Sequence, residues 1–411
     1  MAGTTSSPLG LYIALQSTGL VEIAFDPAKS CEESISVTSI NTKAGFKPNW
    51  VLPQKDKVYS VSRTNFPFKG TSSGGIHAFK QAESGAGLEP INHVSSRGEG
   101  GCHLDVSPDG KIVVVSNITG STVTVCRLED DGSVGEPTYV FDYNKTAPDE
   151  VEAHPHQASF DESGKLMIVT LRTMDKVDIY SYKGPNDITL AKRFALPTKG
   201  AGPRHFTTLT KSPNNIYLYV VSEKENSIRV YTVNTESSEI VVELKQTLST
   251  MGKDLPLTEF GKDFAAEVHV SNDGKFLYAS NRGMQNQDND TISVYSIDPD
   301  PANDEHHLTH VDTQRTYGKH PRSFSLSPDQ ENRFVAVANQ FSQDVVIFER
   351  DPMTGRLGDM RGKLNCTASL PPRSPPDQVT LKKAVNWEGT VDLREILHGR
   401  EGGPVCVQWK K

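Results

Sequence analysis

Side chains able to carry acid–base or anion-binding chemistry recur at regular intervals along this sequence. The turn residues Gly110, Gly164, Asn215, Gly274 and Asn332 are 54, 51, 59 and 58 residues apart, and a weaker first copy is centred on Asp56. Before the turns stand Trp50, His103, His156, Arg204 with His205, Glu267 and Arg322. Seven or eight residues after the later turns stand Asn117, Arg172, Glu223, Asn281 with Arg282, and Asn339 with Gln340. Such regular spacing indicates that a repeated structural unit presents these residues.

The residue types in these two sets predict a site for a small anion. The sets contain four arginines, whose planar guanidinium group suits a carboxylate or a phosphate: Arg172, Arg204, Arg282 and Arg322. Only Glu223 and Glu267 oppose them, so the group is cationic on a chain whose formal net charge is −8. In a purely structural alternative, the glutamates neutralise the arginines and the histidines make ordinary hydrogen bonds. Burying several arginines around one point is unfavourable without compensation, which favours a ligand site.

Each copy of the repeat predicts four short antiparallel strands. An alternating segment leads to the turn, and a β-branched and aromatic segment follows it, as in residues 112–116 and 276–280. Third segments follow at residues 121–126, 176–182, 227–233, 291–297 and 344–348, and a fourth strand is expected in each variable linker. Four strands in roughly 50 to 60 residues is the spacing of a propeller blade.

Six copies are visible, and the two ends of the chain are expected to form a seventh blade. Residues 11–25 and 404–409 both predict strands, and their pairing would close the ring without a free sheet edge. The expected fold class is therefore all-β, a single seven-bladed β-propeller domain spanning residues 1–411. Residues 364–400 are expected to form a surface insertion in the last blade. A pair of β-sandwiches with coincidental turns is the alternative.

A propeller would bring both sets of residues to one end of its axis. The first strand of each blade lines the axial channel, and the second strand runs antiparallel to it. The start of the first strand and the end of the second therefore lie at the same end of the ring. We expect the two sets of side chains to surround one mouth of this channel.

The composition limits the other function classes. With 51 acidic and 43 basic residues, the chain lacks the net basic charge typical of nucleic-acid binders. No stretch approaches the roughly 18 apolar residues of a membrane-spanning helix, and the first ten residues lack the pattern of a secretory signal. Five scattered cysteines without a C-x-x-C pair fit a reducing compartment, so a cytoplasmic location is expected.

No metal and no cofactor is expected. His306, His307 and His310 cluster in a linker, and His154 and His156 fall on one strand face, but neither spacing is diagnostic of a metal site. The sequence has no phosphate-binding glycine loop and no G-x-S-x-G nucleophile motif. It also lacks the Trp-Asp dipeptides of interaction propellers, which disfavours a scaffold function.

A set of short segments resembles a known family. The segments are His154-Pro155-His156-Gln157, Gly202-Pro203-Arg204-His205, Val220-Val221-Ser222-Glu223, Ala265-Ala266-Glu267-Val268, Tyr278 to Gly283, Pro321-Arg322, Ala338-Asn339-Gln340 and a closing hairpin from Arg350 to Leu357. Together they span residues 48 to 358 and resemble the seven-bladed lactonase propellers, also called the cycloisomerase family. That family includes bacterial 6-phosphogluconolactonase and the fungal 3-carboxy-cis,cis-muconate lactonizing enzyme. The first blade and residues 364–400 depart from the family pattern, which leaves the rim and the substrate open.

The resemblance implies roles for individual residues. Positions that match the active residues of the muconate enzyme are His156, Arg204, Glu223 and Arg282, which are therefore the expected catalytic residues. At the same mouth we expect substrate binding by His103, Glu267, Asn281, Arg322 and Gln340. The expected partner is a small anionic substrate that carries a carboxylate or a phosphate, while the oligomeric state and the natural substrate stay open.

Two reactions fit these groups. In lactone hydrolysis, Glu223 or His156 would act as the general base toward water, while Arg204 and Arg282 would hold the anionic tail and the oxyanion. In muconate cyclisation, the arginines would hold a polycarboxylate while one carboxylate attacks a double bond and His156 or Glu223 donates a proton to carbon. A non-catalytic binding propeller is the third possibility, and it predicts that Glu223 is dispensable.

Of these, we favour hydrolysis of a sugar-acid lactone of the 6-phosphogluconolactone type, a reaction of carbohydrate metabolism. The segments around Glu267 and Arg282 resemble the phosphogluconolactonase branch of the family more closely than the muconate branch. This preference is an analogy at the level of the fold.

Overall fold

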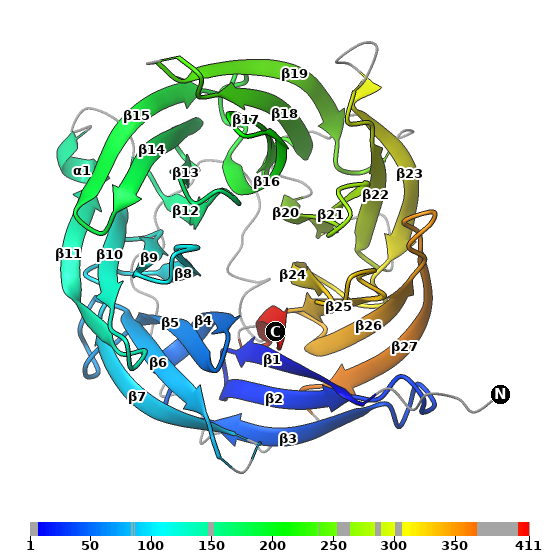
Figure 1. Cartoon of the computed structure of the whole chain (residues 1–411). Helices are drawn as coiled ribbons and strands as arrows, with labels where there is room; N and C mark the ends of the chain where they lie inside the picture. The colour runs from blue at the N-terminus through cyan, green and yellow to red at the C-terminus, as the bar shows by residue number, and fades with distance from the viewer. Residues whose placement is uncertain are drawn as a thin grey trace.

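Seven four-stranded antiparallel sheets surround one central axis in the computed structural model (Figure 1). The structure describes residues 7–83, 85, 87–146, 152–237, 239–252, 264–283, 289–300, 306–367 and 402–410. In six sheets the strands pair in the order in which they occur along the chain, and in the seventh the C-terminal strand joins the three N-terminal strands. The expected seven-bladed all-β propeller is confirmed, and the β-sandwich alternative is wrong.

The blades are numbered along the chain from the first complete repeat, and each starts with its innermost strand. Blade 1 contains β4 (Phe46–Gln54), β5 (Lys57–Thr64), β6 (Gly75–Gln81) and β7 (Leu88–Ser95). Blade 2 contains β8 (Gly101–Val106), β9 (Ile112–Asn117), β10 (Thr122–Leu128) and β11 (Val134–Asp142), followed by the short helix α1 (Tyr143–Thr146). Blade 3 contains β12 (Pro155–Phe160), β13 (Leu166–Leu171), β14 (Lys176–Gly184) and β15 (Asp187–Ala195).

The remaining blades follow the same order. Blade 4 contains β16 (Pro203–Ser212), β17 (Asn215–Ser222), β18 (Ser227–Asn234) and β19 (Val241–Ser249). Blade 5 contains β20 (Phe264–Val270), β21 (Phe276–Arg282), β22 (Thr291–Ile297) and β23 (Leu308–Arg315). Blade 6 contains β24 (Pro321–Leu326), β25 (Phe334–Asn339), β26 (Asp344–Arg350) and β27 (Leu357–Asn365). Blade 7 contains β28 (Pro404–Trp409), β1 (Leu9–Leu15), β2 (Gly19–Phe25) and β3 (Ile35–Asn41).

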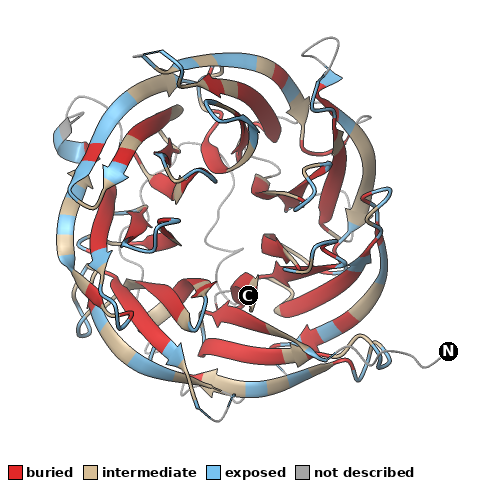
Figure 2. Cartoon of the chain, in the orientation of Figure 1, coloured by how far each residue is buried: buried red, intermediate tan, exposed pale blue. Residues whose placement is uncertain are grey.

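The second strand of each blade is buried on both faces because neighbouring blades pack face to face. All six residues of β9 (IVVVSN) and of β25 (FVAVAN) are buried. The outermost strands are half exposed: in β15, Ile188 is buried while Thr189 and Leu190 face solvent. Figure 2 shows this gradient, with buried inner and middle strands and tan or blue outer strands. Runs of β-branched residues thus predict the middle strands well, and the polar outer strands less well.

The seventh blade closes the ring with strands from both ends of the chain, as expected from the sequence. β28 pairs antiparallel with β1, with Leu11 opposite Trp409. The Trp409 indole packs against Phe25 and Phe334, and its Nε1 donates a hydrogen bond of 3.0 Å to the carbonyl oxygen of Ser325 in blade 6. This residue therefore connects the closing blade to its neighbour.

Every inner strand has a shift in register near the end that faces the channel mouth. The shifts lie between Pro48 and Trp50, Gly101 and His103, Pro155 and Ala158, Pro203 and His205, Ala265 and Val268, Pro321 and Ser323, and between Pro404 and Cys406 opposite β1. An extra residue at a β-bulge bends its strand and redirects its side chain. Corresponding bulge residues in the seven blades are Asn49, Cys102, His156, Arg204, Ala266, Arg322 and Val405. The bulges therefore place one residue per blade at the same level of the channel.

The expected insertion at 364–400 is mostly outside the described residues. Leu364 and Asn365 belong to β27, Cys366 and Thr367 form a turn, and residues 368–401 are not described. The assignment of 1–411 to a single domain with an insertion stays a prediction. Within the described ranges, no helix is long and apolar enough to cross a membrane.

Replacing Trp409 tests the closure of the ring. Trp409→Ala removes a side chain that is 3% exposed and packs across two blades, so we expect the free energy of unfolding to fall by about 3–5 kcal/mol. Trp409→Phe retains most of the packing and loses the hydrogen bond, so about 1–2 kcal/mol should be lost. Urea unfolding followed by circular dichroism measures both values. Equal, small losses in the two variants would contradict this account of closure.

Candidate active site

Two levels of charged side chains meet at the end of the channel where the inner strands begin. The bulges of β12, β16 and β24 carry His156, Arg204 and Arg322. Next to them lie the residues at the ends of the second strands: Arg172 after β13, Glu223 after β17 and Arg282 at the end of β21. We call the group of Arg63, Arg172, Arg204, Glu223, Arg282 and Arg322 the arginine mouth.

Glu223 is the shared counter-charge of this group. Its Oε1 accepts a hydrogen bond of 2.8 Å from Arg282 Nη2, and its Oε2 accepts one from Arg172 Nε. Arg204 Nε lies 4.0 Å from the same Oε2. One carboxylate thus contacts guanidinium groups from blades 3, 4 and 5. The structure therefore brings together Arg204, Glu223 and Arg282, three of the four residues for which a catalytic role is predicted.

Backbone carbonyl groups also hold two of these arginines in place. Arg204 Nη1 donates a hydrogen bond of 2.7 Å to the carbonyl oxygen of Ala266, and Arg282 Nη2 donates one of 3.0 Å to that of Ala265. The two arginines are only 2% and 3% exposed. The Nε atoms of both find no hydrogen-bond acceptor among the described residues. Buried donors without a partner are rare, and here they point to a site that an anion or water completes.

Positive charge at the arginine mouth exceeds what Glu223 neutralises. Burial opposes ionisation of Glu223, but Arg172, Arg282 and Arg204 outweigh it and hold its pKa well below the usual range of a glutamic acid. Burial, together with Arg282 and Arg63, lowers the pKa of Arg322 to about 10. Like charges at close range disfavour one another, so an anionic ligand would relieve the repulsion.

Two residues near this mouth were missed by the sequence analysis. Arg63 is the second-last residue of β5 and lies seven residues past Asp56. The offset that placed Asn117 and Asn281 at the mouth would therefore also have placed Arg63 there. His320 directly precedes Pro321 as His154 precedes Pro155, and its Nε2 lies 3.3 Å from Arg282 Nη1. Its imidazole ring stacks on Phe341 with centroids 3.9 Å apart.

His156 lies beside the arginines as a neutral, buried imidazole. Burial, then Arg204 and His205, lower its pKa well below the ordinary value, so the ring is uncharged at neutral pH. Its Nδ1 has no hydrogen-bond partner among the described residues, and its ring centroid lies 4.9 Å from that of His205. A neutral imidazole with a free nitrogen can accept a proton.

A layer of aromatic and imidazole side chains lies one step deeper and separates the two ends of the channel. We call it the floor, and it consists of Trp50, His103, His205 and Glu267. The ring of His205 lies 5.5 Å from that of His103 and 5.6 Å from that of Trp50. Its Nδ1 and Glu267 Oε1 are 2.6 Å apart, so Nδ1 donates to the carboxylate and Nε2 keeps its lone pair. Burial raises the pKa of Glu267 and lowers that of His205.

The floor corrects the predicted positions of His103 and Glu267. The strand register places both residues one position after the bulge residue of their strand. They therefore correspond to His205 in β16, whereas Arg204 is the bulge residue of that strand. The physical reason is the extra residue of the bulge, which sequence offsets cannot reveal. His103 and Glu267 therefore lie below the arginine mouth, and their role in substrate binding stays a prediction.

Asn281 has a different environment from the one expected of a substrate-binding residue. Its Nδ2 donates a 2.7 Å hydrogen bond to the carbonyl oxygen of Thr250 and one of 3.2 Å to Thr291 Oγ1. Asn117 and Asn339 use the same atom in the same way in blades 2 and 6. This repeated pattern indicates that Asn281 links its blade to the segment that follows the outer strand of the preceding blade. Its role in substrate binding stays a prediction. Gln340, by contrast, follows β25 at the level of Glu223 and is buried, and its Oε1 has no hydrogen-bond partner within the part of the chain that the structure describes.

The histidine clusters noted in the sequence have other contacts. His307 Nε2 lies 2.8 Å from the hydroxyl of Tyr219, and its ring stacks on Tyr217. His154 Nε2 lies 3.0 Å from Glu152 Oε2. Across the part of the chain that the structure describes, no group of three or more His, Cys, Asp or Glu side chains is arranged to hold a metal ion.

Comparison with known proteins places the chain among lactonase propellers. Residues 8–369 match the model of the family described as lactonase, 7-bladed beta-propeller. The chain is 28% identical over 328 residues to the 6-phosphogluconolactonase of Formosa agariphila, covering 77% of this chain and 85% of that protein. It is 26% identical over 358 residues to that of Bacillus subtilis, covering 85% and 92%.

The fold is also similar to that of solved structures. The periplasmic gluconolactonase of Pseudomonas aeruginosa superposes with a TM-score of 0.74 over 98% of this chain and 99% of that one, at 22% identity. The crystal structure of a protein from Lactobacillus plantarum gives a TM-score of 0.72 over 98% of this chain and 100% of that one, at 20% identity. These two likenesses concern the fold alone.

Glu223→Gln tests whether the shared carboxylate holds the arginines. The variant leaves three guanidinium groups, two of them buried, without their counter-charge, so we expect it to lose about 3–5 kcal/mol of unfolding free energy. Inorganic phosphate should restore part of this loss and raise the melting temperature of the variant more than that of the wild type. Thermal unfolding in phosphate and in chloride at matched ionic strength measures the effect.

The matched control is Glu349→Gln, which removes an exposed carboxylate 2.9 Å from Arg361. That change should cost less than about 1 kcal/mol and should not alter the response to phosphate. A loss for Glu223→Gln no larger than the loss for this control would contradict the proposed electrostatic role of Glu223.

Proposed function

The chain belongs to the seven-bladed β-propeller lactonase family, and we propose that it hydrolyses the ring ester of a small anionic sugar-acid lactone of the 6-phosphogluconolactone type. The observation that carries the proposal is the arginine mouth, where three of five clustered arginines share the carboxylate of Glu223 beside a neutral histidine. The named activity of the relatives from Formosa agariphila and Bacillus subtilis supports the same substrate class.

In this proposal the arginines bind and orient the substrate. The phosphate of the lactone pairs with the outer guanidinium groups, Arg63, Arg172 and Arg322, which Glu223 neutralises only in part. Arg204 and Arg282 keep unpartnered Nε–H groups that can donate to the lactone carbonyl oxygen. Donors already fixed in place stabilise the oxyanion of the tetrahedral intermediate without reorganisation.

His156 is the general base of the proposed reaction. It takes a proton from water as the water oxygen attacks the lactone carbonyl carbon, and the resulting imidazolium returns that proton to the ring oxygen as the carbon–oxygen bond breaks. The product is the open-chain hydroxy acid, and the proposed reaction requires no cofactor. The anionic substrate offsets the positive charge of Arg204, which makes His156 more basic when the substrate is bound.

Glu223 is a poor candidate for the general base. Three guanidinium groups hold its pKa well below the usual range, and a carboxylate so strongly stabilised has little affinity for a proton. We therefore assign Glu223 to positioning the arginines. This choice departs from the sequence-based expectation that either Glu223 or His156 serves as the base.

Muconate cyclisation remains the second candidate because the same arginines would hold a polycarboxylate. In that reaction a proton donor must reach carbon, and neutral His156 would first have to be protonated against its lowered pKa. A non-catalytic binding function would leave the free nitrogen of His156 without use. A cytoplasmic location stays a further proposal, supported by five free cysteines, four of them buried.

Arg204→Lys and Arg282→Lys test the proposed substrate contacts. Each variant keeps the positive charge and loses the planar fork, so kcat/KM for 6-phosphogluconolactone should fall by about 10²–10³-fold. Acid release in a pH-stat, corrected for spontaneous hydrolysis, measures the rate. The control Arg333→Lys changes an exposed arginine and should keep the wild-type rate.

The same assay decides between the candidate functions. Gluconolactone without phosphate should be a poorer substrate, and 3-carboxy-cis,cis-muconate should keep its diene absorbance. If the muconate were consumed and the lactone were not, the hydrolase proposal would be wrong. If neither reacted while both bound, the protein would be a binding module.

The pH profile tests the role of His156. Because burial and Arg204 lower the pKa of His156, the ring of the free enzyme stays unprotonated well below pH 6.5, so kcat/KM should stay constant from neutral pH to below that value and then fall as the ring gains a proton. His156→Asn should lower kcat by about 10²–10⁴-fold and remove this acid limb. An acid limb that persists unchanged in His156→Asn would show that another group is the base.

A further inference from the structure

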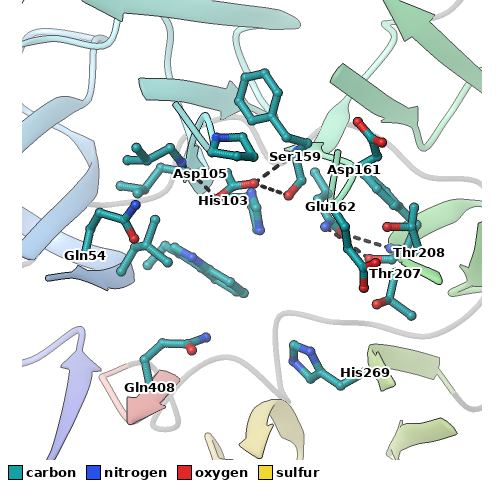
Figure 3. A pocket seen from close by; sticks show the side chains of 18 residues that line it. Gln54, His103, Asp105, Ser159, Asp161, Glu162, Thr207, Thr208, His269 and Gln408 are labelled. Carbon is teal, nitrogen blue, oxygen red and sulfur yellow. Dashed lines mark hydrogen bonds between the residues drawn. The ribbon is translucent and has the colours of Figure 1, made fainter. Parts of the chain in front are cut away.

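A second cavity opens at the opposite end of the axial channel. Its volume is about 480 Å³, and it is lined by the far halves of β4, β8, β12, β16, β20 and β28, where the inner strands approach their hairpin turns. Figure 3 shows Gln54, His103, His269 and Gln408 around one space, each from a different strand. We call it the far cavity. Its volume falls within the range of small-molecule sites, about 300–1,000 Å³.

The floor separates the far cavity from the arginine mouth. Trp50 and His103 belong to the floor and form the inner wall of the cavity, while no residue of the arginine mouth lines it. The indole of Trp50 and the imidazole of His103 lie 4.4 Å apart, centroid to centroid, and both are nine-tenths or more buried. The two ends of the channel are therefore distinct sites.

The charge of the far cavity excludes an anion. Among the described residues, its lining contains three carboxylates, Asp105, Asp161 and Glu162, and neither lysine nor arginine. The carboxylates already accept hydrogen bonds from the protein: Asp105 from Ser159 Oγ and the backbone of Phe160, and Glu162 from Thr210 Oγ1 at 2.7 Å. These hydrogen bonds hold the carboxylates in place as acceptors, and among the described residues no group of three or more His, Cys, Asp or Glu side chains is arranged to hold a metal ion.

The wall of the cavity offers unsatisfied hydrogen-bonding groups beside an aromatic surface. Trp50 Nε1 and His103 Nδ1 are buried and have no hydrogen-bond partner among the described residues. The side-chain amides of Gln54 and Gln408, each a donor and an acceptor, lie on the same lining. A flat indole next to several mixed donors and acceptors suits a ligand whose hydroxyl groups both donate and accept and whose ring has an apolar face.

We propose that the far cavity is a second binding site, for a neutral saccharide of one or two rings. The indole of Trp50 packs against the sugar ring, and Trp50 Nε1, Gln54 and Gln408 bind its hydroxyl groups. The site differs in charge from the arginine mouth, so the two ends of one channel accept different ligands, an anion at one end and a neutral sugar at the other.

Calorimetric titration of the full-length protein with maltose tests this site. Maltose should bind with a roughly millimolar Kd, and phosphate at saturating concentration should leave that Kd unchanged because phosphate binds at the other end. Gln54→Ala and Gln408→Ala, tested separately, should each weaken maltose binding by about tenfold through a lost hydrogen bond. Gln340→Ala, an amide removed at the arginine mouth, should leave it within about twofold.

Three results would overturn the proposal. The first is no heat of binding with maltose or glucose up to concentrations far above the expected Kd. The second is displacement of maltose by phosphate, which would place the sugar at the arginine mouth. The third is tight binding of 1,4-diaminobutane without binding of either sugar, which would show that the carboxylates select a cation.

Discussion

One buried carboxylate shared by three guanidinium groups organises the functional end of this propeller. Glu223 contacts Arg172, Arg204 and Arg282, which come from three successive blades. Removing several charges from water is unfavourable unless each finds a partner, and one carboxylate cannot balance all the arginines around it. In the proposed function, the remaining positive charge binds the anionic group of the substrate. The same imbalance keeps Glu223 ionised and His156 neutral, and the proposed function therefore assigns positioning to Glu223 and proton transfer to His156.

The propeller supplies the geometry that this interaction needs. Closure by β28 and β1 keeps seven inner strands around one axis, and a β-bulge at the mouth-facing end of each strand turns one side chain toward the channel. Successive positions along the strands then form levels: the arginine mouth, the floor, and the far cavity. Because the levels differ in composition, one end of the channel is cationic and the other end is the proposed site for an uncharged, polar ligand. Trp50 and His205 lie between the two ends.

The repeat made the blades, the ring closure and the meeting of Arg204, Glu223 and Arg282 predictable, because a constant interval along the chain becomes a constant height in the ring. The offsets failed where a single extra residue matters. His103 and Glu267 lie one level deeper than expected because the bulge before them is invisible in the sequence. Asn281 donates a hydrogen bond to the segment that follows the outer strand of the preceding blade, as Asn117 does. Arg63 was missed because the first copy of the repeat is weak, and the far cavity because its residues come from strand positions that carry no shared motif.

The most direct measurement is a crystal structure with the product 6-phosphogluconate bound. We expect the phosphate of the product beside Arg63, Arg172 and Arg322, and its carboxylate beside Arg204 and Arg282. The carboxylate carbon should lie next to His156, with Glu223 still in contact with its arginines. Product bound in the far cavity or on the outer surface, with the arginine mouth unoccupied at saturating concentration, would contradict it.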